Sequence, residues 1–271
     1  MSDSSKPFDQ AKGRPASATP LQPRRRAILV GSSGGIGAAL ARKLATEGYT
    51  LALVDRNAEF SQAVSNEINQ KYSEIRSLNY KHDVTEYSSV PELLRRVIAD
   101  LGGLDLFIYT AGFIHFPRID EYDFEEDLKM MEVNLVGGMA WLSQVASLFE
   151  SMKSGQIVGV SSVAGDRGRV GNPGYNASKA GFTSYLESLR NRLTRHGVNV
   201  ITIKPGMVRT EMLQLPGAPR PVFAVTAEQA ADGIWDAIRK RRQVAYISGI
   251  WRWIMLVIRH VPSVIFRRMS F

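Results

Sequence analysis

The sequence contains no cysteine, which excludes disulfide bonds and cysteine-ligated metal sites from this chain of 271 residues. Histidine is scarce as well. The four histidines, His82, His115, His196 and His260, show no spacing typical of metal ligands, so we predict no metal site. We interpret His82 and His115 as loop residues, with His115 a candidate for substrate contact. The lack of cysteine fits a reducing compartment.

Long hydrophobic runs are also missing. No uninterrupted apolar stretch approaches the ~20 residues of a membrane-spanning helix. Residues 1–22 are rich in Ser, Pro, Ala and Lys and contain no apolar segment of the kind that secretory signals carry. We therefore expect a disordered N-terminal lead over 1–22 and a cytoplasmic protein.

Positive charge is in excess. The formal net charge is +8, and much of it lies in the runs 24–26 and 239–242 and in the tail, residues 249–271. A basic balance can indicate a nucleic-acid partner, but the sequence has no basic–aromatic strip and no nucleic-acid-binding motif, so we predict no such partner. An acidic cofactor or an anionic membrane surface explains the charge equally well.

Short apolar segments alternate with segments of helical periodicity along the chain. This alternation predicts an α/β fold with a single doubly wound, Rossmann-type parallel sheet and helices on both faces. We expect one domain over 23–248, without internal repeats. The expected strands are 27–30, 51–54, 77–81, 104–109, 156–161, 198–204 and 244–247. The expected helices are 36–47, 59–72, 88–101, 124–151 (one long helix or two), 175–195 and a helix capped by Thr226 that runs to 240.

A glycine-rich turn, 31–37, connects the first expected strand to the first helix. Glycines there allow a tight turn and a close backbone approach to a pyrophosphate at the helix N-terminus. Asp55 ends the second strand, where a carboxylate can bind both ribose hydroxyls of an adenosine. Alone, such a turn is also found as a plain strand–helix connection, and Asp55 could be a capping residue.

Asp55 also bears on the choice of cofactor. A 2′-phosphate beside its carboxylate would place like charges close together, at a cost of about 1–4 kcal/mol. This favours NAD(H). Arg56 acts in the opposite direction, because an arginine can bind a phosphate through two donors, and it keeps NADP(H) open.

Tyr175 and Lys179 lie four positions apart in an expected helix, so their side chains share one face. A nearby ammonium stabilises a phenolate, so we expect Lys179 to lower the pKa of Tyr175 and to make it an acid or base near neutral pH. A Tyr-x-x-x-Lys pair on its own is more often surface packing.

Several further motifs accompany the pair of Tyr175 and Lys179, which argues against coincidence. Through these motifs the chain resembles the short-chain dehydrogenase/reductase (SDR) family over about 24–247. The turn resembles the family's T-G-x-x-x-G-I-G, with Val30 in place of Thr. Residues 109–112 (Tyr-Thr-Ala-Gly) stand where the family has N-N-A-G, and 205–210 (Pro-Gly-Met-Val-Arg-Thr) match its P-G-x-V-x-T. Cofactor binding is implied for Gly31, Ser33, Gly34, Gly35, Ile36, Gly37, Asp55, Arg56, Asp83, Val84, Ala111, Gly112, Tyr175, Lys179, Pro205, Gly206, Val208 and Thr210.

The resemblance also implies four catalytic residues. Ser162 would hydrogen-bond the substrate oxygen, Tyr175 would exchange a proton with it, and Lys179 would tune Tyr175 and hold the nicotinamide ribose. Asn134 would hold a water that relays protons from Lys179 to solvent. The implied reaction is hydride transfer between a nicotinamide and a secondary alcohol or ketone. A homodimer or homotetramer is implied, with the helices after Asp123 and Tyr175 as its interface.

The segments 113–116, 163–172 and 207–225 follow strands and should shape the substrate cleft. They are largely apolar, which indicates a lipophilic substrate. Reduction of acyl-carrier-bound 3-oxoacyl groups is an alternative, since basic runs could bind an acidic carrier. A dinucleotide-sensing scaffold without turnover and a membrane-interaction module are alternatives from other classes.

The tail, 249–271, combines Trp, bulky aliphatic residues and Arg, with no acidic residue. This composition suits the plane of a membrane interface, so contact with the cytoplasmic face of a membrane is one expectation. The tail resembles the C-terminal ends of bacterial reductases in this family that act on lipid-linked substrates, such as decaprenylphosphoryl-ketopentose reductase. Packing on a partner subunit or over the cleft is the other expectation.

Overall fold

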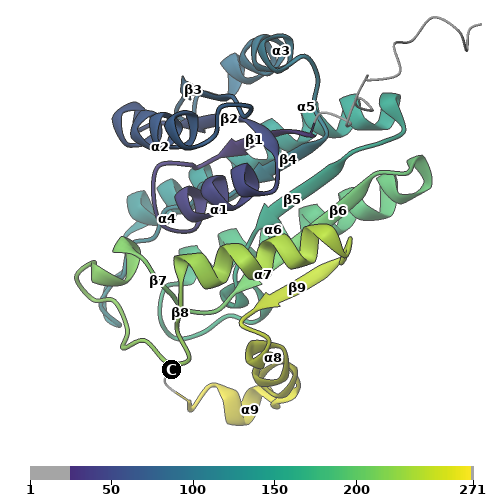
Figure 1. Ribbon diagram of the computed structural model, residues 1–271. Coiled ribbons are helices and arrows are strands. Elements are labelled where there is room, and N and C mark those ends of the chain that lie inside the picture. Colours follow the sequence, from purple (N-terminus) through teal and green to yellow (C-terminus); the bar gives the residue numbers. More distant parts are fainter. Residues whose placement is uncertain (1–24, 270–271) are drawn as a thin grey trace, which may run out of the picture.

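Seven parallel strands form the centre of the computed structural model, which describes residues 25–269 (Figure 1). The predicted N-terminal lead, 1–22, lies outside the described residues. The strands pair in the order β3-β2-β1-β4-β5-β6-β9. They are β1 (Arg25–Val30), β2 (Tyr49–Asp55), β3 (Ser77–Lys81), β4 (Leu106–Tyr109), β5 (Gln156–Val160), β6 (Asn199–Pro205) and β9 (Val244–Ile247).

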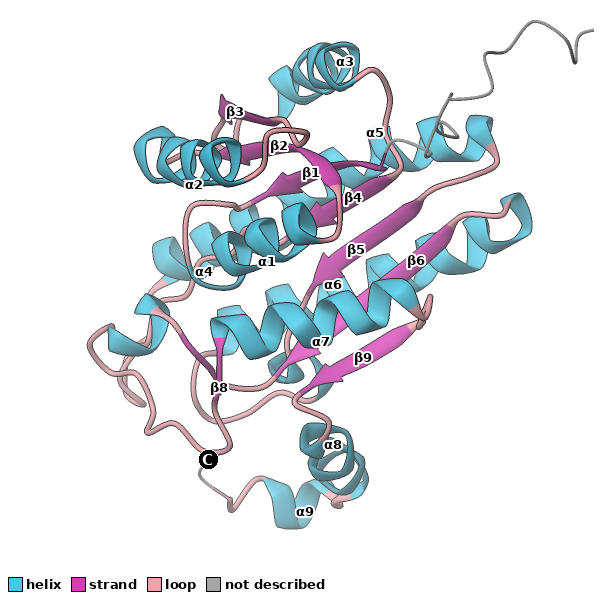
Figure 2. Cartoon of the chain, in the orientation of Figure 1, coloured by secondary structure: helices cyan, strands magenta, loops and turns pink. Residues whose placement is uncertain are grey.

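The strands carry apolar residues on both faces, because helices cover both. In β1, Ala27 and Leu29 face one half of the core, and Ile28 and Val30 face the other; all four are fully buried. One face is covered by α1 (Gly35–Thr46), α2 (Ala58–Lys71) and α7 (Ala227–Arg239). The opposite face is covered by α3 (Val90–Leu101), α5 (Gly137–Met152) and α6 (Pro173–Leu193) (Figure 2). The predicted fold class is confirmed.

The segment predicted as one long helix or two is interrupted. After α4 (Phe124–Met131) the chain makes one π-helical turn, Glu132–Val136, and then continues as α5. Such a turn inserts one residue into the helical ladder and re-aims the side chains in it. Here it places Asn134 in the interior, where it is fully buried.

Thr226 begins α7 as predicted. Its hydroxyl accepts a hydrogen bond from the Gln229 N–H at 3.2 Å, and the Gln229 side chain accepts one from the Thr226 N–H at 3.0 Å. This reciprocal pair satisfies two N–H groups at the helix start. A short parallel pair, β7 (Val208–Arg209) and β8 (Val225–Thr226), leads into it.

The tail forms α8 (Ile250–His260) and α9 (Ser263–Phe266) beside the carboxyl end of β9 (Figure 1). Trp251 and Met255 are buried and pack with Val163, which follows β5. The face of α8 that carries Trp251 and Met255 therefore packs over the cleft, which was one of the expectations for the tail. Within 25–269, no helix has the length and apolar character needed to cross a membrane.

Candidate active site

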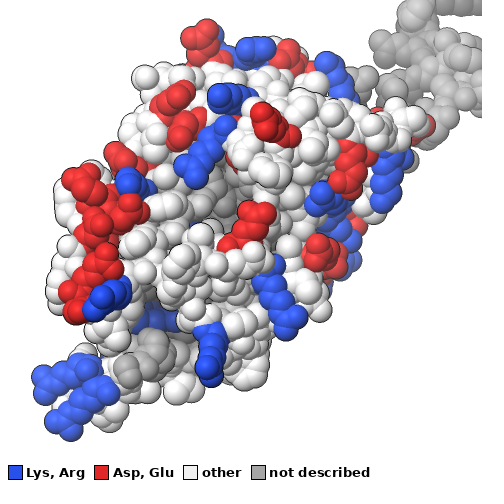
Figure 3. Space-filling view, turned by 90° about the vertical axis from the view of Figure 1, so that its left-hand side faces the viewer, with Lys and Arg blue, Asp and Glu red and all other residues white. Residues whose placement is uncertain are grey.

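A cavity of about 640 Å³ opens at the carboxyl ends of the parallel strands. Figure 3 looks onto this side of the molecule, where the surface is hollowed near the middle. In open α/β sheets, loops at this edge form the ligand-binding crevice. All the residues predicted to bind the cofactor line the cavity, and so do Ser162, Tyr175 and Lys179; Asn134 is the exception.

The glycine turn requires glycine at two positions. A Cβ on Gly37 would lie 1.9 Å from the Gly31 carbonyl oxygen, and a Cβ on Gly31 would lie 2.3 Å from the Ala111 nitrogen. Gly31 also has φ +88°, a conformation that favours glycine. The turn therefore brings bare backbone to the N-terminus of α1, which can receive phosphate oxygens.

Asp55 and Thr110 fix the shape of this turn. The Asp55 carboxylate accepts hydrogen bonds from the N–H groups of Ser33 and Asn57, both at 2.9 Å. The Thr110 hydroxyl lies 2.9 Å from the Val30 oxygen and 2.7 Å from the Gly31 oxygen. Thr110 replaces an asparagine of the motif, and its hydroxyl still links β4 to the glycine turn.

Asp83 follows β3 at the side of the cavity near Asp55. Its carboxylate accepts hydrogen bonds from the backbone N–H and the hydroxyl of Thr85, at 3.0 and 2.8 Å. Burial acts to raise the pKa of Asp83, but these hydrogen bonds and the charges of Arg56 and His82 lower it overall. Asp83 is thus an ionised acceptor at the cavity wall.

Ser162 and Tyr175 bring two hydroxyl groups together in the cavity. Ser162 lies two residues beyond the end of β5, and its hydroxyl accepts a hydrogen bond from the Ala164 N–H at 3.0 Å. Tyr175 lies in the first turn of α6, which Asn172 caps by accepting the Tyr175 N–H at 3.1 Å. The hydroxyl groups of Ser162 and Tyr175 are hydrogen-bonded to each other.

Burial raises the pKa of Tyr175, against the opposing effects of the Ser162 hydrogen bond and the positive charge of Arg169. The prediction that the Tyr175 pKa is lowered is therefore wrong for this structure, and Lys179 is not among the groups that shift it. The Lys179 ammonium lies 5.7 Å from the centre of the Tyr175 ring and donates to the Val160 carbonyl oxygen at 3.1 Å. Loss of hydration therefore outweighs the neighbouring charges.

Lys179 is almost fully buried, and burial lowers its pKa to about 8. Between this value and the ordinary 10.5, the unfolded chain holds a proton that the folded chain does not. Stability should therefore rise with pH across this window. We expect the unfolding free energy of the wild type to rise relative to Lys179→Met from pH 8 to 10, in urea titrations. A constant difference across these pH values would contradict the buried, weakly basic Lys179.

Asn134 does not line the cavity but stabilises its wall. Its amide oxygen accepts the Phe113 N–H at 2.7 Å, and its amide nitrogen donates to the Phe113 carbonyl at 2.9 Å and to the Ser178 hydroxyl at 3.0 Å. The side chain thus joins the loop after β4 to α6. The role of Asn134 in a water relay remains a prediction. In this structure both polar atoms of its side-chain amide already form hydrogen bonds within the protein.

The loop after β5 contains residues that sequence reasoning did not single out. Asp166 forms a buried ion pair with Lys204, and its second oxygen accepts the Tyr246 hydroxyl at 2.8 Å. Arg167 donates to the carbonyls of Ile258 and Val261 at the end of α8. These partners lie far apart in the sequence, and no local pattern identifies them.

His115 does not line the cavity, and its carbonyl oxygen accepts a hydrogen bond from the Asn172 side chain. His82 does line it, but its Nε2 is 3.0 Å from the Ser89 hydroxyl and burial lowers its pKa. Both therefore act as structural residues here. Among residues 25–269, no group of three or more His, Asp or Glu side chains could hold a metal ion.

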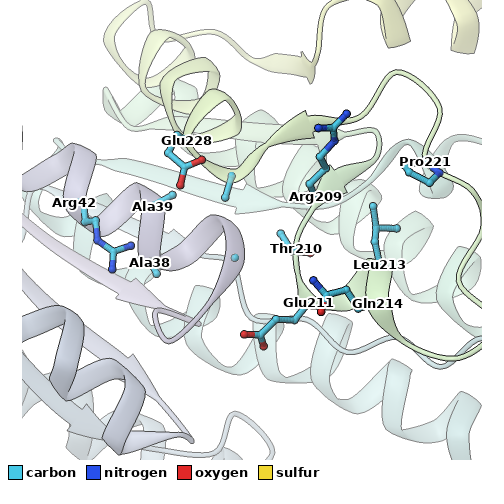
Figure 4. Close-up of a pocket in the computed structure, with 12 residues that line it drawn as sticks. Ala38, Ala39, Arg42, Arg209, Thr210, Glu211, Leu213, Gln214, Pro221 and Glu228 are labelled. Atoms are coloured by element: carbon cyan, nitrogen blue, oxygen red, sulfur yellow. The ribbon is translucent and has the colours of Figure 1, made fainter.

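The segment after β7 separates the cavity from a second pocket of about 500 Å³. In Figure 4, Arg209, Thr210 and Glu211 lie on this segment, across from Arg42 of α1. Thr210 borders both pockets and packs on the start of α1, since a Cβ on Gly35 would lie 2.9 Å from its methyl carbon. This segment therefore forms a wall of the cleft.

Comparisons with known proteins agree with this geometry. A family model described as short chain dehydrogenase matches residues 25–218. An uncharacterized oxidoreductase from Myxococcus xanthus is 34% identical over 202 residues, which cover 74% of this chain and 79% of the relative.

Two solved structures share the fold. A short-chain dehydrogenase from Sphingobium yanoikuyae in complex with NADPH has a TM-score of 0.77 and 22% identity, covering 88% of this chain and 97% of that one. An alcohol dehydrogenase from the archaeon Thermococcus sibiricus, complexed with 5-hydroxy-NADP, has a TM-score of 0.73 and 24% identity, covering 83% and 95%. This chain therefore belongs to the short-chain dehydrogenases, a family of oxidoreductases.

Proposed function

We propose that the protein interconverts a secondary alcohol and a ketone with a nicotinamide dinucleotide as hydride carrier. The observation that supports this most directly is the convergence of Ser162, Tyr175 and Lys179 on the cavity that the glycine turn and Asp55 also line. These groups come from four separate segments of the chain. Together they provide the hydroxyl donors of Ser162 and Tyr175, the cation of Lys179, and, in the glycine turn, backbone N–H groups that can bind phosphate.

The residues present fit the dinucleotide. The glycine turn offers backbone N–H groups at the start of α1, and the Asp55 carboxylate lies at the end of β2 for the adenosine ribose. Gly112 lies next to Lys179, since a Cβ there would be at ordinary contact distance, 3.5 Å, from the Lys179 nitrogen. When bound, the nicotinamide supplies or accepts the hydride.

The chain's own residues handle the proton and the charge on the substrate oxygen. In the reducing direction Tyr175 donates its hydroxyl proton to that oxygen, and the Ser162 hydroxyl donates a hydrogen bond to it. The oxygen becomes more negative as the reaction proceeds, so both donors stabilise the transition state more than the bound ketone.

We favour NAD(H) over NADP(H) as the cofactor. Asp55 lines the cavity, its carboxylate is largely buried, and each of its oxygens accepts one backbone N–H. A 2′-phosphate here would meet a fixed negative charge. The Sphingobium and Thermococcus proteins were solved with NADPH and an NADP derivative, and Arg56 lines the same part of the cavity, so NADP(H) is the competing choice.

The substrate we propose is lipophilic. Phe113, Ile114, Phe116, Met207 and Met212 all line the cavity. Apolar lining of this kind favours burial of hydrocarbon, at about 0.8 kcal/mol per methylene group. A lipid-linked substrate would be the most lipophilic case, and the resemblance of the tail to the C-terminal ends of reductases of such substrates suggests it.

A panel of methyl ketones and secondary alcohols of rising chain length, assayed with both cofactors, tests reaction, cofactor and substrate together. We expect kcat/KM to rise with chain length and to be at least about ten-fold higher with NADH than with NADPH. Asp55→Asn should lower the ratio of kcat/KM with NADH to kcat/KM with NADPH, because it removes the negative charge beside the 2′-phosphate.

Faster turnover of small polar ketones would contradict the lipophilic substrate. A preference for carrier-bound 3-oxoacyl groups over free ketones would favour the carrier alternative. Tight NADH binding without turnover of any carbonyl compound would favour the sensing scaffold.

We also propose that the outer face of the tail contacts an anionic membrane. Trp253, Leu256 and Val257 of α8 and Val264 and Ile265 of α9 are all at least half exposed, although the inner face of α8 is buried. Arg252, Arg259, Arg267 and Arg268 are exposed among them, with no acidic residue in the tail. In Figure 3 the lower end of the molecule, where α8 and α9 lie, shows blue and white side chains without red ones. Apolar and cationic groups together match a lipid headgroup region.

The double variant Trp253→Ser/Val257→Ser should reduce binding to vesicles that contain phosphatidylserine by about ten-fold or more, because two exposed apolar anchors are lost. Sedimentation with vesicles measures this. Phe60→Ser, which removes an exposed apolar side chain from α2, is the matched control and should leave binding unchanged. Equal binding by wild type and double variant would contradict the membrane contact.

A homodimer or homotetramer formed through α4, α5 and α6 remains our proposal for assembly. Phe124 and Leu128 of α4, Val136 of the π-helical turn and Met139 of α5 are exposed apolar residues. Exposed apolar residues that gather into a patch mark a surface for interaction with another protein. A monomer mass by light scattering at micromolar concentration would contradict it.

A further inference from the structure

Arg169 is a cationic side chain in the cavity that the proposed chemistry does not require. It lies in the loop between Ser162 and α6 and lines the cavity with Tyr175. Its Nε and Nη2 atoms are buried and have no hydrogen-bond partner among residues 25–269. Burial lowers the pKa of Arg169, with Asp166 and Tyr175 as the neighbouring groups that oppose this.

Two other arginines of the described residues 25–269, the buried Arg190 and the half-buried Arg167, have hydrogen-bond partners. Arg190 donates to the Val200 carbonyl at 2.8 Å and to the Thr202 hydroxyl at 2.5 Å. Arg167, two residues before Arg169, donates to two carbonyls at the end of α8. Asp166 cannot easily serve Arg169, because its two oxygens already bind Lys204 and Tyr246. Arg169 is therefore a half-buried cation with two buried donors, Nε and Nη2, that have no partner among residues 25–269.

A buried donor without a partner costs stability, and the cost is larger for a charged group. Nε and Nη2 lie along one edge of the guanidinium, and this edge fits two oxygens of a carboxylate or a phosphate. Arg169 lines the cavity, although Nε and Nη2 themselves are not open to it, so a ligand there provides those oxygens once the guanidinium turns toward the cavity. Arg169 and Tyr175 lie close enough for their charges to interact, which assigns such a ligand to the reacting end of the cleft.

We propose that Arg169 binds a carboxylate or phosphate group carried by the substrate. The substrate is then amphipathic, with an anionic group near the reacting carbonyl and an apolar part against the lining of the cavity. This inference rests on the proposed function, because only the proposed ketone–alcohol chemistry makes the ligand a substrate. The binding of an anion by Arg169 does not depend on turnover. A role limited to tuning Tyr175 would act equally on charged and neutral ketones.

Three ketones that carry an apolar chain on one side of the carbonyl and a group close to it on the other distinguish these roles: 4-oxodecanoate, its methyl ester and 4-oxodecyl phosphate. We expect Arg169→Gln to lower kcat/KM for an anionic ketone by about 10-fold to 100-fold, mainly through KM, and for the ester by less than about 3-fold. Arg169→Lys should retain part of the preference, since it keeps the charge but not the paired donors. Arg192→Gln removes the same charge from the exposed side of α6 and should have no selective effect.

Whichever anionic ketone loses more in Arg169→Gln identifies the group as carboxylate or phosphate. An equal loss for the anionic ketones and the ester would overturn the proposal. So would an unchanged preference for the anionic ketones.

Binding of octanoate and octyl phosphate, measured by isothermal titration without any reaction, tests the anion site independently. We expect at least one of them to bind the wild type about ten-fold or more tightly than Arg169→Gln, while octanol binds both equally. Equal binding of both anions by the two proteins overturns the proposal. Arg169-dependent binding without turnover of any ketone would support the anion site and contradict the proposed reaction instead.

Discussion

Tyr175→Phe is expected to lower kcat for ketone reduction by about 100-fold to 10,000-fold. The variant loses only the hydroxyl group, which donates the proton and is hydrogen-bonded to Ser162. The ring and its packing in α6 remain, so the fold and the cofactor site should be preserved. Steady-state kinetics give the loss, and NADH fluorescence titration should show a Kd within about three-fold of the wild-type value.

Tyr185→Phe is the matched control, because Tyr185 lies in the same helix and is half-buried against the core, outside the cavity. It should keep wild-type kinetics. A Tyr175→Phe variant with more than a tenth of wild-type kcat would remove Tyr175 as the proton donor. Loss of NADH binding in that variant would instead indicate a damaged site.

Lys204→Met should lower the free energy of unfolding by about 3–5 kcal/mol, because it leaves the Asp166 carboxylate buried without its cation. Both side chains of this ion pair are more than nine-tenths buried. For a domain of this size the melting temperature should fall by roughly 6–20 °C. Chemical denaturation and calorimetry measure the two quantities.

Arg118→Gln provides the comparison for Lys204→Met. It breaks the ion pair with Asp120, whose side chains are 80% and 71% exposed, and exposed pairs contribute little. Its melting temperature should match that of the wild type. If Lys204→Met also melts at the wild-type temperature, the ion pair does not stabilise the loop between Ser162 and α6.

The order of elements could be predicted from the sequence because its signals are local. Strands such as 27–30 read as short apolar runs, and Thr226 with Gln229 three residues later marks a helix start. The glycine turn and Asp55 were recognised for the same reason, and the structure brings both to the cavity.

The residues that could not be predicted depend on contacts between distant segments. Asp166 and Lys204 pair across 38 positions, and Arg167 reaches carbonyls more than 90 positions away. No sequence pattern identifies Arg169, because its importance depends on two guanidinium donors that find no hydrogen-bond partner among residues 25–269. The π-helical turn at Asn134 was missed since periodicity does not register one inserted residue.

The pKa of Tyr175 shows the same limit at the catalytic site. The spacing of Tyr175 and Lys179 predicts their shared face, but the direction of the pKa shift depends on burial, which spacing does not report. The same burial that raises the pKa of Tyr175 lowers that of Lys179 to about 8.

Trp251 of the tail lies directly on Gly206 of the cofactor-binding motif, and a Cβ on Gly206 would be 1.9 Å from the Trp251 indole nitrogen. These two positions therefore cannot vary independently during evolution. Relatives that keep a tail helix with a large aromatic residue here must keep glycine, and relatives with any side chain at 206 must have a smaller residue or a displaced helix at 251. The tail thus constrains a motif whose glycine would otherwise be attributed to the cofactor alone.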